Sequence, residues 1–585
     1  MSAAKKRSPV KTSSRKGKSK LKRFLIGFLV ILFLVFGTVA ATVYFYGNDL
    51  LKKFITETVK SDSEGLYQVE IRSLYIDVFT GSIRVNGFQL IPDTALYRKI
   101  RETDTVAPFL VYARVDRLRV TGIEFLKALR DKNVLIKKIL VQSPELEVHL
   151  YPPPRLIKKT GPKKILLAIP LPAVLHSIGL GELQIRDGKL TVYFHSPEKT
   201  THIHVPDIAI TATSFFIDSK HKSSTAILNT KDITIELKNL VLETPDKMNT
   251  LSFGKIRLST SSSDVTVNNF HLKPAFSKKD YSRKLGYQSD RLDVQVQSLH
   301  ISQLDLRQML VEHKLVISSV AVDGLLVDDY RDKRVPERRD FFPPMPQQAL
   351  LKTKQYLKID KVTLMNGKAT YSEQVGPEPG VLFFDKMSAV VTNLTNDSDL
   401  VRKKTVMDVQ GTAWLMGKGK LTANIRFPLG APHDAFTFSA VLSRLPLTEV
   451  NPMLTKLAPA IITAGDLTSL VIPTVYADNE SSRGIMKFSY SGLKVNLINQ
   501  KQDNWSKIKT TLLNTAANMY IQDNNPPPNG KFRTGVIYFK RNKTASIFNF
   551  LWKSTFSGLK STMGINNKEQ KELKKKERKK KGKKN

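Results

Sequence analysis

The sequence contains no cysteine among its 585 residues. This absence excludes disulfides, cysteine-ligated zinc, iron–sulfur clusters and thiol nucleophiles together. Tryptophan is nearly as scarce, since Trp414, Trp505 and Trp552 are the only ones, which argues against aromatic platforms for sugars. The sequence also has no G-x-S-x-G and no H-E-x-x-H motif, so two common hydrolase sites are missing.

The remaining signals for a catalytic or metal site are weak. Gly411–Lys418 resembles a phosphate-binding loop, but it has five intervening residues instead of four, and Gly419 stands where a magnesium-binding Ser or Thr belongs. We interpret it as a hairpin turn. His202 and His204 share one face of a predicted strand without a recognisable third ligand. We therefore predict no catalytic residue, no metal and no cofactor.

Acidic residues are few relative to basic ones: 52 Asp and Glu stand against 92 Lys and Arg, for a formal net charge of +40. Two tails hold part of this surplus. Residues 1–23 carry ten Lys/Arg and no acid, and residues 568–585 carry eleven Lys/Arg and three Glu. The body between them is also basic, and such a surface favours anionic partners.

One long uncharged run stands near the N-terminus, from Phe24 to Tyr46. Its 23 residues, at about 1.5 Å rise each, can cross a hydrocarbon core of about 30 Å. We predict a membrane anchor in which Leu32 and Val35 face lipid and Tyr44 and Tyr46 lie at the interface.

The basic residues before this run predict a cytoplasmic N-terminus, with everything after Gly47 on the other side of the membrane. A cleaved signal peptide is the alternative, and the small residues Ala40 and Ala41 would suit a peptidase. The length of the run favours an uncleaved anchor. This topology separates the basic body from cytoplasmic nucleic acid, so we expect no nucleic-acid partner.

The rest of the chain shows the two-residue alternation of half-buried strands. Clusters of Asp, Asn, Gly and Lys separate these runs, and helical periodicity is rare. The pattern predicts a mostly β fold with short helices. The clearest runs are Leu183–Ile185, Leu190–Phe194, Ile233–Leu237, Val265–Val267, Leu292–Val296 and Phe436–Phe438.

A repeated unit of about 80 residues is present. The stretch beginning at Val115 aligns without gaps with the stretch beginning at Val296, an offset of 181. The match resumes at an offset of 179, where Ile185 meets Leu364. Each copy predicts a strand, a short helix, a strand, a proline-containing connection and further strands. Repeats of this kind bury their apolar surfaces against one another.

A helix is predicted at residues 545–564, followed by the lysine-rich tail at 565–585. One face of this helix carries the apolar residues Phe548, Leu551, Trp552 and Leu559, while Lys553, Ser557 and Lys560 lie on the other face. An amphipathic helix beside a basic run can lie on an anionic membrane surface. The alternative is a helix that caps the last sheet, with a solvated tail.

Taken in order, four features resemble the AsmA-like family of bacterial envelope proteins. They are the anchor followed by Tyr67–Ile71 and Gly81–Gly87, the duplicated unit, the run Leu445–Leu454 with Ala464–Leu467, and Gly484–Val495 before the terminal helix. The resemblance implies a long curved antiparallel sheet that forms an open apolar groove, as in bridge-like lipid-transfer proteins. It also implies an inner-membrane anchor, a periplasmic body, and a role in phospholipid transport and outer-membrane integrity.

From this resemblance and the alternation we predict that Ile185, Val192, Ile359 and Leu364 line a lipid groove. The expected partners are phospholipid, the inner membrane, and a second membrane surface or outer-membrane assembly proteins. The alternative function is a scaffold or regulator of outer-membrane protein assembly.

The predicted segments are a basic tail at 1–23, the anchor at 24–46, a β region at 47–114, the first unit with following strands at 115–295, the second unit at 296–400, a C-terminal β region at 401–544, the helix at 545–564 and the tail at 565–585.

Overall fold

The computed structural model describes residues 46–102, 109–124, 130–131, 133–151, 177–196, 198–218, 231–458, 460–497, 522–563 and 570. The predicted N-terminal tail, the anchor up to residue 45, and the C-terminal tail apart from Gln570 lie outside these ranges. Within the ranges, no helix is long and apolar enough to cross a membrane.

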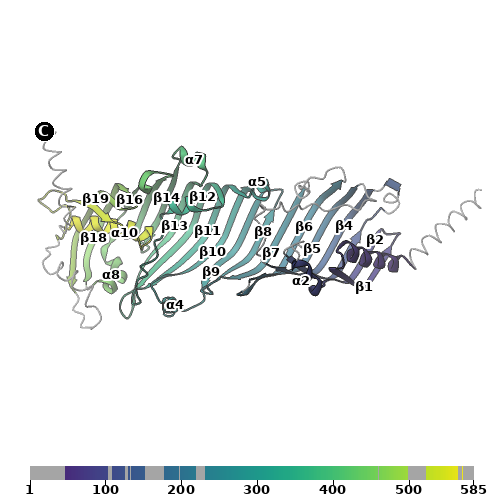
Figure 1. Cartoon of the computed structure of the whole chain (residues 1–585). Coiled ribbons are helices and arrows are strands. Elements are labelled where there is room, and N and C mark those ends of the chain that lie inside the picture. Colours follow the sequence, from purple (N-terminus) through teal and green to yellow (C-terminus); the bar gives the residue numbers. More distant parts are fainter. Residues whose placement is uncertain are drawn as a thin grey trace, which may run out of the picture. The chain divides into compact units, whose positions relative to one another are not determined.

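The described chain is mostly β, as the alternation predicts, and its twenty strands are assigned to one mixed sheet (Figure 1). The strands are β1 (Tyr67–Asp77), β2 (Ser82–Pro92), β3 (Phe109–Thr121), β4 (Asn133–Leu150), β5 (Ser177–His195), β6 (Thr200–Asp218), β7 (Asp232–Glu243), β8 (Asn249–Ser259), β9 (Asp264–Pro274), β10 (Asp290–Leu304), β11 (Lys314–Asp332), β12 (Tyr356–Gln374), β13 (Pro379–Thr395), β14 (Val406–Leu415), β15 (Gly419–Pro428), β16 (Phe436–Leu442), β17 (Leu445–Pro446), β18 (Ala460–Ala477), β19 (Ser481–Leu497) and β20 (Thr534–Lys540).

The helices are short apart from the first and the last. They are a helix over residues 46–62, α2 (Thr94–Glu102), α4 (Tyr281–Leu285), α5 (Leu306–Val311), α6 (Pro346–Lys352), α7 (Ser398–Arg402), α8 (Asn451–Leu457) and α10 (Ile547–Thr562), with 3-10 turns at Pro432–Asp434 and Leu447–Val450.

The chain divides into two compact units, and β6 contributes residues to both. Unit 1 comprises residues 1–203 and 209–231, and unit 2 comprises residues 204–208 and 232–585. In unit 1, β1 to β4 pair as successive antiparallel neighbours, and β4 pairs with β5 in parallel. In unit 2, β7 to β16 pair in chain order, and β18, β19 and β20 follow β16.

The prediction of an antiparallel sheet is wrong at two places, where β4 pairs with β5 and β11 pairs with β12 in parallel. Two parallel neighbours need a connection that returns to the starting edge of the sheet. The registers correspond under the offsets of the sequence repeat, because Ile136 faces Leu180 in the first pair and Ile317 faces Ile359 in the second. The connection in unit 2, residues 333–355, includes α6.

A line of residues with left-handed backbone crosses the strands of unit 2, and we call it the slip line. It includes Asn239, Asn269, Gly324 and Asn366, with φ values of 54°, 54°, 67° and 53°. Asn and Gly adopt this conformation at lower cost than other residues. At this line the alternation of apolar and polar residues shifts by one residue in each strand. In β9, for example, the apolar residues are Val265 and Val267 before the line and Phe270 and Leu272 after it.

The slip keeps the apolar residues on one face along each strand. Phe270 pairs with Phe253 and Val296, and Val267 on the other side of the line pairs with Ile256 and Leu299. A strand that kept strict alternation would send one half of its apolar residues to the opposite face. Here, both halves contribute to the same apolar face, which we call the inner face.

The densest core of unit 2 lies at its C-terminal end. Strands β14–β20 bury their inner-face residues against α6 and α10, and α8 packs beside them. Val475, Met486 and Ile537 have no exposed surface. Met345, just before α6, and Phe550 of α10 are 0% and 1% exposed.

Candidate functional site

The inner face of β7–β13 consists of apolar rows that continue from strand to strand. One row runs from Ile256 through Val267, Leu299 and Val322 to Leu364, each facing the next across the sheet. Ala389 of β13 continues this row. The apolar surface is therefore continuous across these strands.

The two predicted groove residues of unit 2 both belong to this face. Leu364 lies between Val322 and Ala389, and Ile359 lies between Ile317 and Leu394. Both side chains are half-buried. Ile359 also packs in a small cluster beneath α5, which includes Leu306 and Met309. Leu364 is not part of this cluster.

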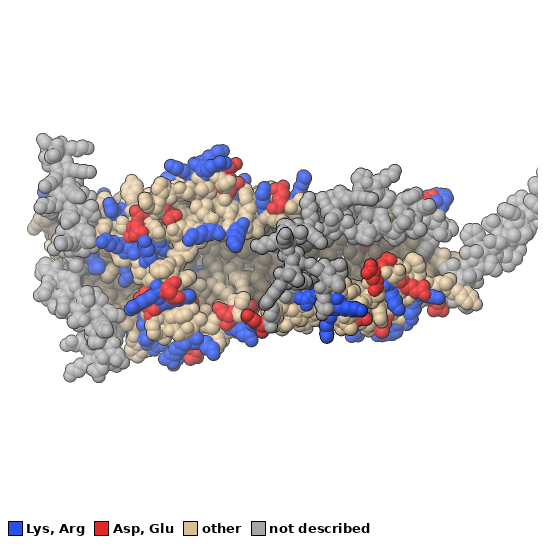
Figure 2. Space-filling view, viewed as in Figure 1, with Lys and Arg blue, Asp and Glu red and all other residues tan. Residues whose placement is uncertain are grey.

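The inner face of β7–β13 is only partly covered. No residue of β8 is buried, and Pro274 is the one buried residue of β9. The substantial contacts of β8 are with its sheet neighbours β7 and β9. Figure 2 shows a hollow over these strands, with uncharged side chains inside it and Lys, Arg, Asp and Glu along its margins. Apolar side chains here contact solvent instead of a second protein layer.

The opposite face of the same strands is polar. Glu236 forms ion pairs with Lys255 at 2.9 Å and Arg257 at 3.6 Å. His271 Nε2 lies 2.8 Å from Asp293 Oδ1, and Lys278 Nζ lies 2.7 Å from Asp328 Oδ2. Exposed pairs of this kind contribute little stability each. Their position shows that the sheet is sided, with its charges on the outer face.

Unit 1 has the same sidedness over its own strands. The predicted groove residues Ile185 and Val192 face Val141 and Val148 across the β4–β5 pair, and both are half-buried. At β1 and β2 the apolar face is covered by the helix over residues 46–62, whose Leu51, Ile55 and Val59 pack on buried strand residues including Val69, Ile71 and Leu74.

The predicted terminal helix exists as α10, but its buried side is not the predicted apolar stripe. Phe550 packs against Phe436 and Phe539, with ring centroids 6.2 Å apart in each case. Leu551 and Leu559 pack against the core, whereas Phe548 and Trp552 are 78% and 52% exposed. The helix therefore caps the sheet with one side. The interfacial role of Phe548 and Trp552 remains a prediction.

The assignment of Ser557 to the solvated face of this helix is wrong. Ser554, Ser557, Gly558 and Ser561 are buried, because they pack directly on β20. The backbone N–H of Tyr538 donates to Ser557 Oγ at 3.2 Å, and that of Val536 donates to Ser561 Oγ at 2.9 Å. These serines satisfy donors on a strand edge that would otherwise be open to another strand.

Charged residues interrupt the inner face at one place, which we call the inner charged cluster: Asp290, Asp329, Arg331, Tyr371 and Glu373. Arg331 Nη1 donates to Asp290 Oδ1 at 3.1 Å, and Tyr371 Oη donates to Glu373 Oε2 at 2.6 Å. Asp329 occupies an inner-face position between Leu292 and Tyr371. Its Oδ1 and Arg331 Nε are buried and have no hydrogen-bond partner among the described residues.

The electrostatics of this cluster are unusual for a strand surface. Burial raises the pKa of Asp329 to about 7, and the nearby Asp290 carboxylate adds to this rise while Arg331 opposes it. Lys333 pairs with Glu373 at 2.6 Å. The pKa of Lys553 on α10 is also lowered, first by desolvation of its ammonium and then by the charge of Lys333, although the residue as a whole is exposed.

Sequence reasoning missed this cluster because the run Val327–Lys333 looks like the solvated end of a strand. The signal was available in the alternation, since Leu325, Val327, Asp329 and Arg331 share one parity. Because alternate residues of a strand lie on the same face, Asp329 belongs on the face of Leu325 and Val327, and its carboxyl is therefore expected on the inner face.

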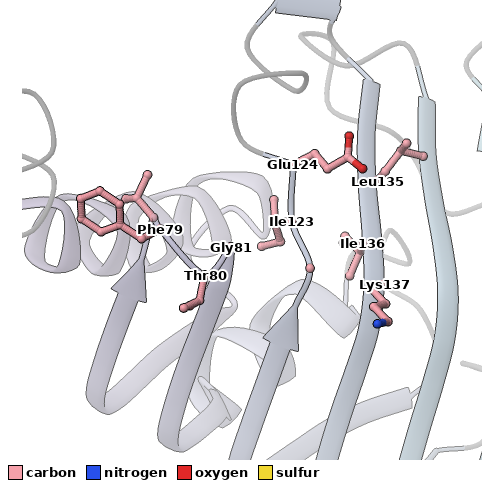
Figure 3. Close-up of a pocket in the computed structure, with 10 residues that line it drawn as sticks. Phe79, Thr80, Gly81, Ile123, Glu124, Leu135, Ile136 and Lys137 are labelled. Atoms are coloured by element: carbon pink, nitrogen blue, oxygen red, sulfur yellow. The ribbon is translucent and has the colours of Figure 1, made fainter. Parts of the chain in front are cut away.

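A separate recess of about 460 Å³ lies in unit 1 at the ends of β1–β4 (Figure 3). Gly81 permits its tight backbone, because a Cβ there would lie 2.4 Å from the carbonyl oxygen of Ile123. Its lining combines the exposed Phe79 with Glu124, Leu135 and Lys137. None of the predicted groove residues lines it, and it contains no nucleophile–base pair.

In the described ranges, no group of three or more His, Asp or Glu is placed to hold a metal ion. Gly411–Lys418, interpreted above as a hairpin turn, spans the connection between the paired strands β14 and β15. No protein-family model matches the chain, and no curated protein matches it.

Proposed function

We propose that the chain is a non-catalytic phospholipid-binding protein whose inner face holds acyl chains, and that it serves phospholipid transport between membranes. The observation that carries this proposal is the continuous apolar surface of β7–β13, which is half-exposed over β8 and β9 and only partly covered by described residues elsewhere. Leaving apolar area in water costs about 25 cal/mol per Å², and about 0.8 kcal/mol per CH₂ of a lipid tail. Lipid tails bound on this face would shield its apolar side chains from water and would themselves be shielded from water.

The resemblance of the sequence to the AsmA-like family supports the rest of the proposal. Phe24–Tyr46 would anchor the protein in the bacterial inner membrane, and the body would lie in the periplasm. Phe548 and Trp552, with the lysine-rich tail, would contact a second, anionic membrane surface. The alternative, a scaffold for outer-membrane protein assembly, expects a covered and dry interior, which the half-exposed strands β7–β13 do not favour.

Native mass spectrometry of the purified full-length chain tests this proposal, together with lipid extraction. We expect several phospholipids per chain. Leu364→Asp should lose bound lipid because it places a charge on the inner face. Thr363→Asp is the matched control, since it adds the same charge one residue away on the other face. Lipid-free wild-type protein that is well folded would contradict the proposal and leave the scaffold.

A further inference from the structure

Charged side chains on the inner face of β7–β13 are confined to one place. Strands β7–β13 are described throughout, and their inner-face positions can be followed from the cross-strand registers. The only charged residues at these positions are Asp290, Asp329, Arg331 and Glu373. They lie on the adjacent strands β10, β11 and β12, near one edge of the sheet. If charged residues were tolerated anywhere on this face, they would be dispersed over it and would not form one group.

The cluster lies where the inner face passes from open to covered. Residues 333–355 leave β11 directly after it, and Met345 and Leu350 of this connection enter the buried core. The connection is held at two points, near its start and in its middle: Gln288 Nε2 donates to Val335 O at 3.0 Å, and Arg541 Nη2 donates to Pro343 O at 2.8 Å. An acyl chain on the open rows of β7–β13 would therefore end beside the cluster.

Besides Arg331 Nε, two groups in and beside the cluster have unused bonding capacity. The pairs Asp290–Arg331 and Glu373–Lys333 neutralise each other. Lys553 on α10 lies within electrostatic range of Lys333 and Glu373, but it forms no ion pair within 4.0 Å in the part of the chain that the structure describes. Asp329 has one carboxyl oxygen without a hydrogen-bond partner among the same residues. One cation and one carboxyl remain for a ligand.

Unused polar groups at the end of an apolar surface match the chemistry of an amphiphile. A phosphate accepts charge-assisted hydrogen bonds from an ammonium, and a buried carboxyl gains from a donor that satisfies its free oxygen. We propose that the inner charged cluster, together with Lys553, binds the phosphate-bearing head group of one phospholipid. Lys553 contacts the phosphate, and Asp329 accepts a hydrogen bond from a head-group ammonium or hydroxyl. This inference rests on the proposed function.

A competition between two lipids with the same tails tests the assignment. The purified full-length chain is loaded from mixed micelles that contain equal amounts of dioleoyl-phosphatidylethanolamine and dioleoylglycerol, which lacks the phosphate. Lipid extraction measures the retained ratio, and native mass spectrometry counts the total lipid per chain. We expect wild-type protein to retain the phospholipid preferentially. Lys553→Gln should lower the ratio about fivefold to tenfold, the size of one charge-assisted contact, and leave the total unchanged.

Lys560→Gln is the matched control, because it removes the same charge from the same helix. The Lys560 ammonium lies 5.3 Å from the Phe556 ring, and the ratio should stay at the wild-type value. An unchanged ratio in Lys553→Gln, or wild-type protein that retains both lipids equally, would overturn the head-group site and leave lipid binding intact. Lipid-free wild-type protein would overturn lipid binding itself. Loss of the preference on adding excess inorganic phosphate would assign the cluster to a free anion and overturn head-group binding.

Discussion

Strands β7–β13 and strands β14–β20 share the same alternation of apolar and polar residues, yet their inner faces have different surroundings. In β14–β20 the inner face is buried by α6 and α10, and Val475, Met486 and Ile537 are fully covered. In β8 and β9, within the β7–β13 region, the corresponding residues are half-exposed. Alternation thus determines which face is apolar, whereas the helices packed on that face determine whether protein covers it. The open strands are the ones available to a ligand.

The largest expected difference between the two regions is in the cost of truncating a phenylalanine. Phe550 is 1% exposed and contacts Phe436 and Phe539, so Phe550→Ala should lower the free energy of unfolding by about 3–5 kcal/mol. Phe270, half-exposed beside Phe253 at 5.3 Å between centroids, should cost less than half as much in lipid-free protein. Chemical denaturation of both variants measures this, and equal losses would contradict an uncovered face.

A second difference concerns pH and Asp329. Its pKa is raised to about 7 in the folded protein from 3.8, so folding takes up a proton. Stability is therefore lost as pH rises from about 4 through 7, and none of this cost remains below the unfolded pKa. Asp329→Asn removes the titrating group, and it should stabilise the lipid-free protein by about 1–3 kcal/mol at pH 8 and by little at pH 4. Thermal unfolding at both pH values measures this, and a pH-independent difference would contradict burial of the carboxyl.

The smaller third prediction concerns the serines of α10 that accept hydrogen bonds from backbone N–H groups at the edge of β20. Ser557→Ala leaves the N–H of Tyr538 without its acceptor, which should cost about 1 kcal/mol. Ser561→Ala should act in the same way on Val536. Hydrogen exchange at these two amides should accelerate in the corresponding variant only. Uniform acceleration along β20 would indicate that α10 had detached.

The smallest expected effect is at the slip line. Asn269 has a φ of 54°, a conformation that costs most residues about 1–2 kcal/mol. Asn269→Ala should destabilise the protein by about 1 kcal/mol, and Asn269→Gly should be nearly neutral. Denaturant unfolding compares the two variants. A glycine variant as unstable as the alanine variant would show that the asparagine side chain, and not its backbone, matters here.

Much of the fold could be predicted from the sequence, because half-buried strands show their faces directly. Val265–Val267 and Leu292–Val296 lie in β9 and β10, as predicted. The parallel pairs were missed, since pairing direction depends on connections that alternation does not describe. The buried side of α10 was also missed, because Ser557 and Gly558 look solvated until β20 is present to receive them.

The candidate site was only partly predictable for the same reason. Leu364 and Ile359 lie on the apolar inner face, but their exposure depends on which helices reach them, and their role in a lipid groove remains a prediction. Asp329 and Arg331 were overlooked, because the one-residue shift of the alternation at Gly324 decides which face they occupy. The predicted anchor at Phe24–Tyr46 lies outside the described residues apart from Tyr46, and it remains a prediction.

Mapping bound lipid along the chain tests the central claim most directly. A phospholipid with a photoreactive group at the end of one acyl chain is loaded onto the full-length protein, cross-linked, and located by peptide mass spectrometry. We predict adducts on inner-face residues of β7–β13 such as Val267, Val322 and Leu364, and none on their outer-face neighbours or on the buried residues of β14–β20. Adducts spread equally over both faces, or confined to α10, would contradict a lipid-binding inner face.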